Sequence, residues 1–225
     1  MMFCIIDALE EVGVDCNIQK FKHAVARRFE AWLRTNPPDV GNTCVDGIEA
    51  YIEANHRYFV KRNDDLLGNG GLMRFLPLAL LGMPDWNIAQ NDITHPSKGS
   101  ATSIQRAQEV IHEALMDRPI GDLPKDLRRP LGTCGDTLNN ALYYQSAQSC
   151  GCAIVLAVND GGDADTIAAI TGGIYGARVG LDYIAKRYSR WMAQLDVSVK
   201  RQIGHSVKVI CDLAQKVHPE WFTTD

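Results

Sequence analysis

Residues 159–177 read NDGGDADTIAAITGGIYGA. Asp163 and Asp165 lie two positions apart and Thr166 follows directly, so their side-chain oxygens can converge on one point at the start of a helix. Two carboxylates that close repel each other unless a cation lies between them or one is protonated. Oxygen ligands without a neighbouring His or Cys suit Mg²⁺, Mn²⁺ or Ca²⁺ rather than zinc. A second interpretation stays open, in which these acids cap the following helix, whose dipole favours negative charge.

The segment after the acids predicts one long, central and buried helix over about residues 166–186. Its small residues fall in a row four positions apart: Ala168, Gly172, Gly176 and Gly180. Each glycine inside a helix costs about 1 kcal/mol relative to alanine. We therefore expect this row to lie against the backbone of a neighbouring helix, because close approach would offset the cost.

This stretch resembles the C-terminal metal motif of the ADP-ribosylglycohydrolases, N-x-G-G-D-T-D-T-I-A, a family that includes the dinitrogenase-reductase-activating glycohydrolases. Three further stretches are similar to motifs of that family and occur in the family's order: GNGGLMRFLP at 68–77, DITHP at 92–96 and GDTLNNAL at 135–142. Four ordered motifs are far more specific than any one of them. The implied fold is all-α, a compact orthogonal helical bundle, with residues 1–225 forming one domain of this type.

The resemblance also implies an activity, which is metal-dependent hydrolysis of ADP-ribose from modified protein side chains or from related ADP-ribosyl compounds. It makes Asp163 and Asp165 the catalytic residues, and these two with Thr166 the metal ligands. The family uses two Mg²⁺ ions, with Mn²⁺ as an alternative, and the expected partner is ADP-ribose or an ADP-ribosylated protein. The substrate-binding residues implied by the matched motifs are Asn69, Gly70, Gly71, Met73, His95 and Asp136.

The N-terminus departs from the family pattern. Residues 1–11 predict an amphipathic helix whose apolar residues begin at once, without a Ser, Thr, Asp or Asn cap. Relatives carry a Thr-Asp-Asp segment directly before this helix, so we expect an N-terminally shortened member with half of the metal shell, one ion or none, and impaired hydrolysis. The alternative is a non-catalytic protein that binds ADP-ribose or a nucleotide. A third interpretation is an incomplete product without a ligand.

Two of the matched motifs also have plain structural interpretations. The glycines of 68–71 predict a turn before an apolar helix over 72–81, where backbone N–H groups can bind an anion, although an ordinary loop gives the same letters. No strand precedes this turn, so a dinucleotide-binding βαβ unit fails its context. His95 fits a hydrogen bond within the corner as well as a contact with a ligand.

Hydrophobic periodicity predicts the remaining helices. Residues 152–158 could form a buried strand, but no other segment offers a strand to pair with, so a helix is favoured. The expected helices span residues 17–34, 43–55, 85–91, 103–116, 138–144, 151–159 and 197–217.

Composition excludes several classes of function. The net charge is -4 and no Lys/Arg block interrupts it, so nucleic acid is not an expected partner. No stretch reaches 18 apolar residues, which argues against a membrane-spanning segment. Seven cysteines at irregular spacings indicate buried, reduced thiols in a cytoplasmic protein rather than disulfides or a zinc site. A monomer is favoured.

Overall fold

Helices account for the regular structure of the chain. The computed structural model describes residues 1–121, 129, 131–145 and 150–222, and within these ranges there is no strand, only an isolated bridge between Gly68 and Thr133. The predicted all-α class is therefore confirmed. The α-helices and the two 3-10 helices (η) are α1 (Met2–Val12), α2 (Ile18–Leu33), α3 (Asn42–Glu53), η1 (Asn69–Arg74), α4 (Leu76–Leu80), α5 (Pro84–Asn91), α6 (Lys98–Leu115), α7 (Cys134–Gln145), α8 (Cys150–Asn159), α9 (Ala164–Arg187), α10 (Ser189–Gln194), α11 (Val197–Val217) and η2 (Pro219–Phe222).

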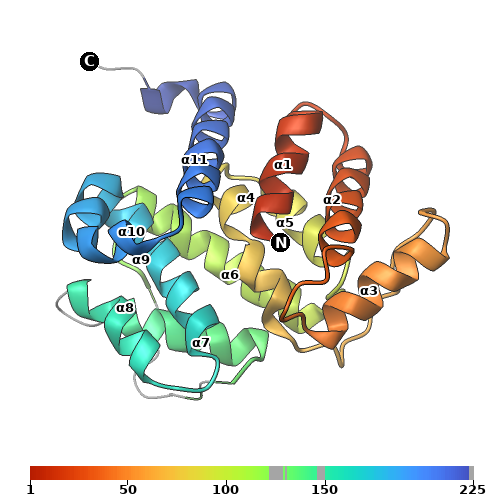
Figure 1. Ribbon diagram of the computed structural model, residues 1–225, viewed down its shortest axis with the longest axis horizontal. Helices are drawn as coiled ribbons and strands as arrows, with labels where there is room; N and C mark the ends of the chain where they lie inside the picture. Colours follow the sequence, from red (N-terminus) through yellow and green to blue (C-terminus); the bar gives the residue numbers. More distant parts are fainter. Residues whose placement is uncertain (122–128, 130, 146–149, 223–225) are drawn as a thin grey trace.

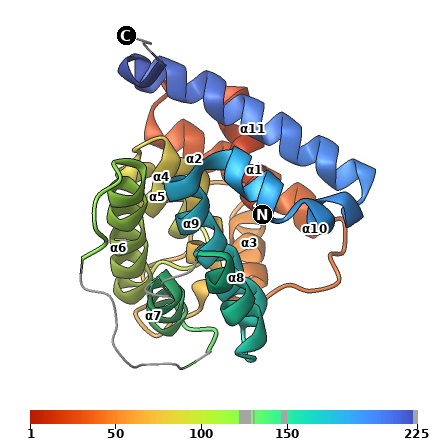
Figure 2. The ribbon, with the colours of Figure 1, turned by 90° about the vertical axis from the view of Figure 1, so that its left-hand side faces the viewer.

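Two groups of helices divide the molecule (Figure 1). On one side α1 packs against α2, with α3 and α5 beside them, and α11 passes over α1. On the other side α9 packs against α6, α7 and α8. Figure 2 shows α11 extended across one end of the molecule, above α1 and α10. The short helices η1 and α4 contact both groups, so the motif at 68–77 lies where the two groups meet.

Each group has its own apolar core. In the first, the predicted stripe of α2 is buried, and Phe21 and Phe29 are fully covered by residues such as Ile5, Leu9 and Ile48. The second contains Leu72 of η1 together with apolar side chains of α6, α7 and α9. Burying one such side chain contributes about 1.5–3 kcal/mol. A third, smaller cluster packs the first turns of α9, directly after the acids, against α7 and α8.

Several predicted boundaries differ from the structure, and the helix predicted at 138–144 begins already at Cys134. The expected helix over 72–81 is a 3-10 helix followed by the short α4, because Pro77 lacks an N–H and would clash in a continuous α-helix. The helix expected at 103–116 begins at Lys98, where the Ser97 side chain accepts a bond from the Ser100 N–H at 3.2 Å. Between the helices predicted at 166–186 and 197–217 the structure contains the short α10, for which no helix was expected.

The small-residue row of α9 is only partly covered, which corrects the expectation of contact with a helix backbone. A Cβ at Gly172 would lie 3.5 Å from the Ile154 side chain, and one at Gly173, next to the row, would lie 3.1 Å from Leu76. A Cβ at Gly176 would meet nothing within 4 Å. At Gly180 the backbone leaves the helical region, with φ 76° and ψ 170°, so this glycine permits a kink. The row thus meets side chains near the start of α9 and is open further along.

The described cysteines are not all buried, which corrects the expectation of buried thiols. Cys44 and Cys134 are buried, whereas Cys152 and Cys211 are exposed. Within the described ranges, no helix has the length and apolar character needed to cross a bilayer.

Candidate active site

A cavity of about 580 Å³ opens where the two groups of helices meet. Its walls come from the start of α1, the end of α2, the loop before α3, η1 and the first turn of α9. Pockets of this size commonly hold small ligands. The lining residues are Met1, Met2, Trp32, Asp39, Val40, Gly41, Cys44, Asn69, Gly70, Met73, Arg74, Gly132, Asp163, Asp165 and Thr166.

The acidic side of the cavity is built by the turn before α9. Gly161 and Gly162 have φ values of 80° and 60°, a region that glycine enters without strain. The turn places Asp163 at the N-cap, where its backbone oxygen accepts from the Ile167 N–H at 3.1 Å. The Asp163 side chain, however, makes no capping bond. Helix capping therefore does not account for this carboxylate.

The Asp163 carboxylate instead binds two neighbouring side chains. Thr166, which is buried, donates its hydroxyl to Asp163 Oδ1 at 2.8 Å. Asn69 donates its amide to Asp163 Oδ2 and also to Thr137 Oγ1, the latter at 2.9 Å. Asp165 lies next to them with its side chain exposed. The two motifs at 68–77 and 159–177 thus form one polar cluster.

The glycine turn is held against the segment that precedes α7. The Asn69 N–H donates to Gly132 O at 3.1 Å, and the Cys134 N–H donates to Leu67 O at 2.8 Å. Gly70 lines the cavity with its backbone, and a Cβ there would lie 2.6 Å from His95 Cε1. No side chain fits at this position without displacing the histidine.

His95 lies beneath this turn rather than in the cavity. Its side chain is buried, and Nδ1 lies 2.8 Å from Thr94 Oγ1. Burial is the main cause that lowers the pKa of His95 to about 3, and the positive charge of Arg74 lowers this pKa further. The ring is therefore neutral at pH 7. The geometry therefore gives this histidine a structural place under Gly70 and does not support the predicted direct contact with ADP-ribose.

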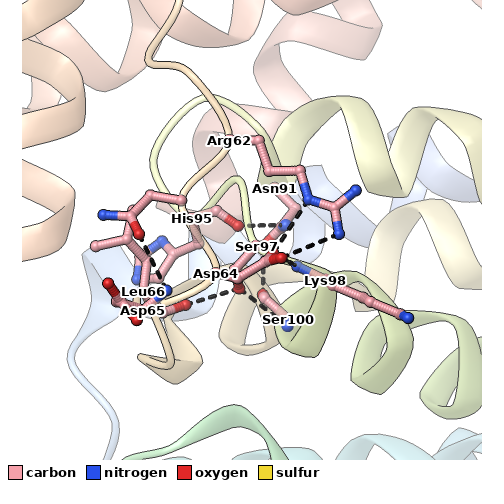
Figure 3. Close-up of polar contacts among 10 residues, drawn as sticks. Arg62, Asp64, Asp65, Leu66, Asn91, His95, Ser97, Lys98 and Ser100 are labelled. Carbon is pink, nitrogen blue, oxygen red and sulfur yellow. Dashed lines mark hydrogen bonds and ion pairs between the residues drawn. The ribbon is translucent and has the colours of Figure 1, made fainter.

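A polar network fixes the corner that carries His95 (Figure 3). Asn91 donates its amide to His95 O at 2.7 Å, and its own oxygen accepts from Ser100 Oγ at 2.7 Å. Ser97 donates to Leu66 O at 2.7 Å, and Asp64 accepts from the backbone N–H of Lys98, again at 2.7 Å. The network joins the loop before η1 to the start of α6.

Two other predicted substrate contacts also lie outside the cavity. Gly71 packs against Asn91, and a Cβ at Gly71 would lie 1.8 Å from Asn91 Oδ1. Asp136 faces a second cavity between α6 and α7, where Thr133 donates its hydroxyl to the Asp136 carboxylate at 2.8 Å. The predicted site residues that the structure does bring together are Asn69, Gly70, Met73, Asp163, Asp165 and Thr166.

Comparison with known proteins agrees with this arrangement of motifs. The family model described as ADP-ribosylglycohydrolase matches residues 1–102 and 85–224, nearly the whole chain. The chain belongs to the ADP-ribosylglycohydrolase family. It is 31% identical over 216 residues to the ADP-ribosyl-[dinitrogen reductase] glycohydrolase of Rhodospirillum rubrum, and the alignment covers 84% of this chain and 71% of that protein.

A solved structure shares the fold of this member of the ADP-ribosylglycohydrolase family. The structure, an ADP-ribosylglycohydrolase-related protein complex, superposes with a TM-score of 0.73 at 22% sequence identity. The match covers 97% of this chain and 78% of the other. The resemblance inferred from four short motifs, including the all-α fold that it implied, is thereby confirmed.

Several cavity residues of this family member were not among the predicted site residues. Trp32 belongs to the apolar stripe of α2, and Asp39 follows two prolines in a loop, so neither position stands out by spacing. Arg74 lies inside the matched motif at 68–77. A charged residue within this apolar segment is the sequence signal that could have identified it as a site residue. Asp39 adds a third carboxylate to the cavity, and Arg74 adds a buried cation.

The cavity offers a few oxygen atoms that could bind a metal ion. Within the described part of the chain, no group of three or more His, Cys, Asp or Glu side chains is arranged to hold a metal. Asp163, Asp165 and Thr166 offer hard oxygen donors, which suit Mg²⁺ or Mn²⁺. Because Mg²⁺ keeps several waters when protein ligands are few, these residues are compatible with one hydrated ion.

Proposed function

We propose that this chain hydrolyses the glycosidic bond that links ADP-ribose to a modified protein side chain or to a related small leaving group. The observation that supports the proposal is the polar cluster of Asn69, Asp163 and Thr166, which lies on one cavity with the exposed carboxylate of Asp165. The cavity's size suits a nucleotide-like ligand. The relative from Rhodospirillum rubrum carries, by its name, an activity of this kind.

The reaction needs a water molecule and a proton acceptor. The bond between the anomeric carbon of the ribose and the nitrogen or oxygen of the side chain breaks, and the water oxygen takes its place. Asp165 is the better placed base, because its carboxylate is exposed and accepts no hydrogen bond from any residue in the described ranges. The proton that it receives is returned to the leaving nitrogen or oxygen.

Asp163 and Thr166 have a supporting part in this proposal. Both oxygens of Asp163 are already oriented, one by Asn69 and one by Thr166. A divalent cation bound by Asp163, Asp165 and Thr166 would supply positive charge that orients the ribose hydroxyls and makes a water molecule easier to deprotonate. Since only a partial set of ligands faces the cavity, we expect weak binding of one ion and slow turnover.

A second candidate is a protein that binds ADP-ribose without hydrolysing it. The observation that favours it is the lack, among the described residues, of a cluster of three metal-ligating side chains. Such a protein would use the same cavity, with Gly70 exposing its backbone to the ligand and Met73 at the wall.

Calorimetry with ADP-ribose, with and without Mg²⁺, tests the proposed site. We expect binding that tightens in Mg²⁺ and that Asp163→Asn weakens. Asp85→Asn is the control, because Asp85 also lies at the start of a helix but is exposed and does not line the cavity. Binding that is equal in all three proteins would remove Asp163 from the site, and binding that ignores Mg²⁺ would favour the non-catalytic candidate.

A further inference from the structure

Arg74, at the end of η1, is a buried cation without an acidic partner in the described part of the chain. Its side chain is 1% exposed, and it lies over the ring of Phe29 with 4.8 Å between the guanidinium carbon and the ring centroid. Burial lowers the pKa of Arg74, yet an arginine keeps its charge in a protein. A buried charge without a counter-charge is expensive, and an apolar side chain of similar volume is often more stabilising. Core packing alone therefore does not explain an arginine here.

Hydrogen bonds of the Arg74 guanidinium connect four segments of the chain. Nη1 donates to Gly70 O at 2.9 Å, inside the glycine turn, and to Met1 Sδ at 3.9 Å, just before α1. Nε donates to Gln90 Oε1 at 2.5 Å, and Nη2 donates to Gln90 O at 3.1 Å, both on α5. Nη2 also donates to Thr94 Oγ1 at 2.7 Å. The fork geometry of a guanidinium permits all of these bonds at once, which a lysine cannot reproduce.

The Thr94 contact extends this connection to the far side of the turn. Because Thr94 Oγ1 accepts from Arg74, its own proton is free to bond His95 Nδ1, 2.8 Å away. The neutral ring of His95 then lies directly under Gly70, where a Cβ would be only 2.6 Å from Cε1. Arg74 thus holds the carbonyl group of Gly70 directly. Through Thr94 it also positions the His95 ring, against which Gly70 packs.

We propose that Arg74 is a positioning residue of the active site, which fixes the Gly70 turn and thereby the amide of Asn69 against the Asp163 carboxylate. Asn69 precedes Gly70 directly, so a shift of the turn moves its side chain away from Asp163. Arg74 acts without bonding the substrate, since its five N–H donors all have protein acceptors. The kinetic test of this inference rests on the proposed function. The Asn69–Asp163 contact itself can be observed without a ligand, so the NMR test does not depend on that function.

The ligand-free test follows the side-chain amide of Asn69 by NMR in Arg74→Met, Arg74→Lys and Phe21→Leu. Phe21→Leu is the control for general destabilisation, because Phe21 is fully buried but has no polar atom to bond Arg74 or the glycine turn. We expect solvent exchange of the Asn69 amide protons to rise about tenfold or more in Arg74→Met, less in Arg74→Lys, and to stay as in the parent in Phe21→Leu. Unchanged Asn69 signals in a folded Arg74 variant would overturn the proposal. If Arg74→Met does not fold, Arg74→Lys decides in the same way.

The kinetic test is a double-mutant cycle between Arg74 and Asn69. If Arg74 acts through Asn69, kcat should fall about tenfold or more in each single variant, and the double variant should be no slower than Asn69→Ala alone. Losses that multiply would show an independent role and contradict the proposal. If the parent chain releases no ADP-ribose, the proposed function fails, and the NMR result alone decides the role of Arg74.

Discussion

Asn69, in the first turn of η1, donates its side-chain amide to the carboxylate of Asp163 at the start of α9, although 94 positions separate them in the sequence. The contact joins two motifs that are far apart in the chain and belong to different helices. Asn69 is buried and also bonds Thr137. The orientation of Asp163 therefore depends on η1 as well as on its own turn.

Replacing Asn69 should damage the site more than the fold. In Asn69→Ala the Asp163 carboxylate loses one of its two donors, so we expect kcat/KM or cation affinity to fall roughly 10–100-fold. The free energy of unfolding should fall by about 1–2 kcal/mol, the usual effect of removing one partner of a buried hydrogen bond. Asn63→Ala, at an exposed loop position, is the control. Equal activity of both variants and the parent would show that the contact has no part in the reaction.

The glycine turn should not tolerate a methyl group. In Gly70→Ala the new Cβ would lie 2.6 Å from His95 Cε1 and 3.1 Å from Cys44 Sγ, so the turn or the histidine must move. We expect a loss of about 1–3 kcal/mol in stability, typical of overpacking, together with weaker binding of ADP-ribose. Gly135→Ala, where nothing lies within 4 Å of the new Cβ, should be neutral or slightly stabilising. Comparable behaviour of the two variants in thermal unfolding would contradict this account of Gly70.

Two glycines of α9 should respond in opposite ways to alanine. Gly176→Ala adds a methyl group in open space and should stabilise the helix by about 0.5–1 kcal/mol. Gly173→Ala brings a Cβ to 3.1 Å from Leu76 Cδ2, so the gain in helix propensity should be offset by the displacement of Leu76. Urea denaturation of the pair measures the difference. A larger gain at Gly173 than at Gly176 would be the opposite of the expected order.

Stability should depend on pH through His95. An unfolded histidine takes up a proton below about pH 6.5, whereas the folded protein keeps His95 neutral down to about pH 3. Protonation therefore favours the unfolded state, and stability should fall with decreasing pH in this window by about 1.4 kcal/mol per pH unit. His95→Gln removes the titrating imidazole. The unfolding free energy of this variant should therefore fall less steeply than that of the parent as the pH is lowered from 6.5 to 4. Identical slopes in the parent and the variant would exclude His95 as the cause.

Sequence periodicity predicts the long helices well, because the apolar residues that recur along the sequence of a helix are the ones that form its buried face. The last helix was placed at 197–217, and α11 spans Val197–Val217. The prediction for α9 was less complete. Spacing alone identifies a row of small residues, but it does not show that the Ile154 side chain lies against Gly172 while Gly176 stays open.

In the site, too, residues within short motifs can be predicted from the sequence, whereas residues brought in by distant segments cannot. The acids and the glycine turn were predicted from motifs, and the structure places Asn69, Gly70, Asp163, Asp165 and Thr166 together on one cavity. Whether His95 enters the cavity or supports the turn from beneath depends on side chains from α3, α5 and η1, which no local pattern describes. Trp32 and Asp39 join the cavity only because α2 ends beside it.

The central claim is that the acids of α9 make this cavity a cation-dependent glycohydrolase site. The most direct measurement is release of ADP-ribose from peptides that carry mono-ADP-ribosylated arginine or serine, in excess Mg²⁺ and in excess EDTA. We predict slow release that requires Mg²⁺ and that falls about 100-fold or more in Asp165→Ala, with Asp85→Asn unchanged. Release that persists in EDTA, or that Asp165→Ala leaves intact, would contradict the account.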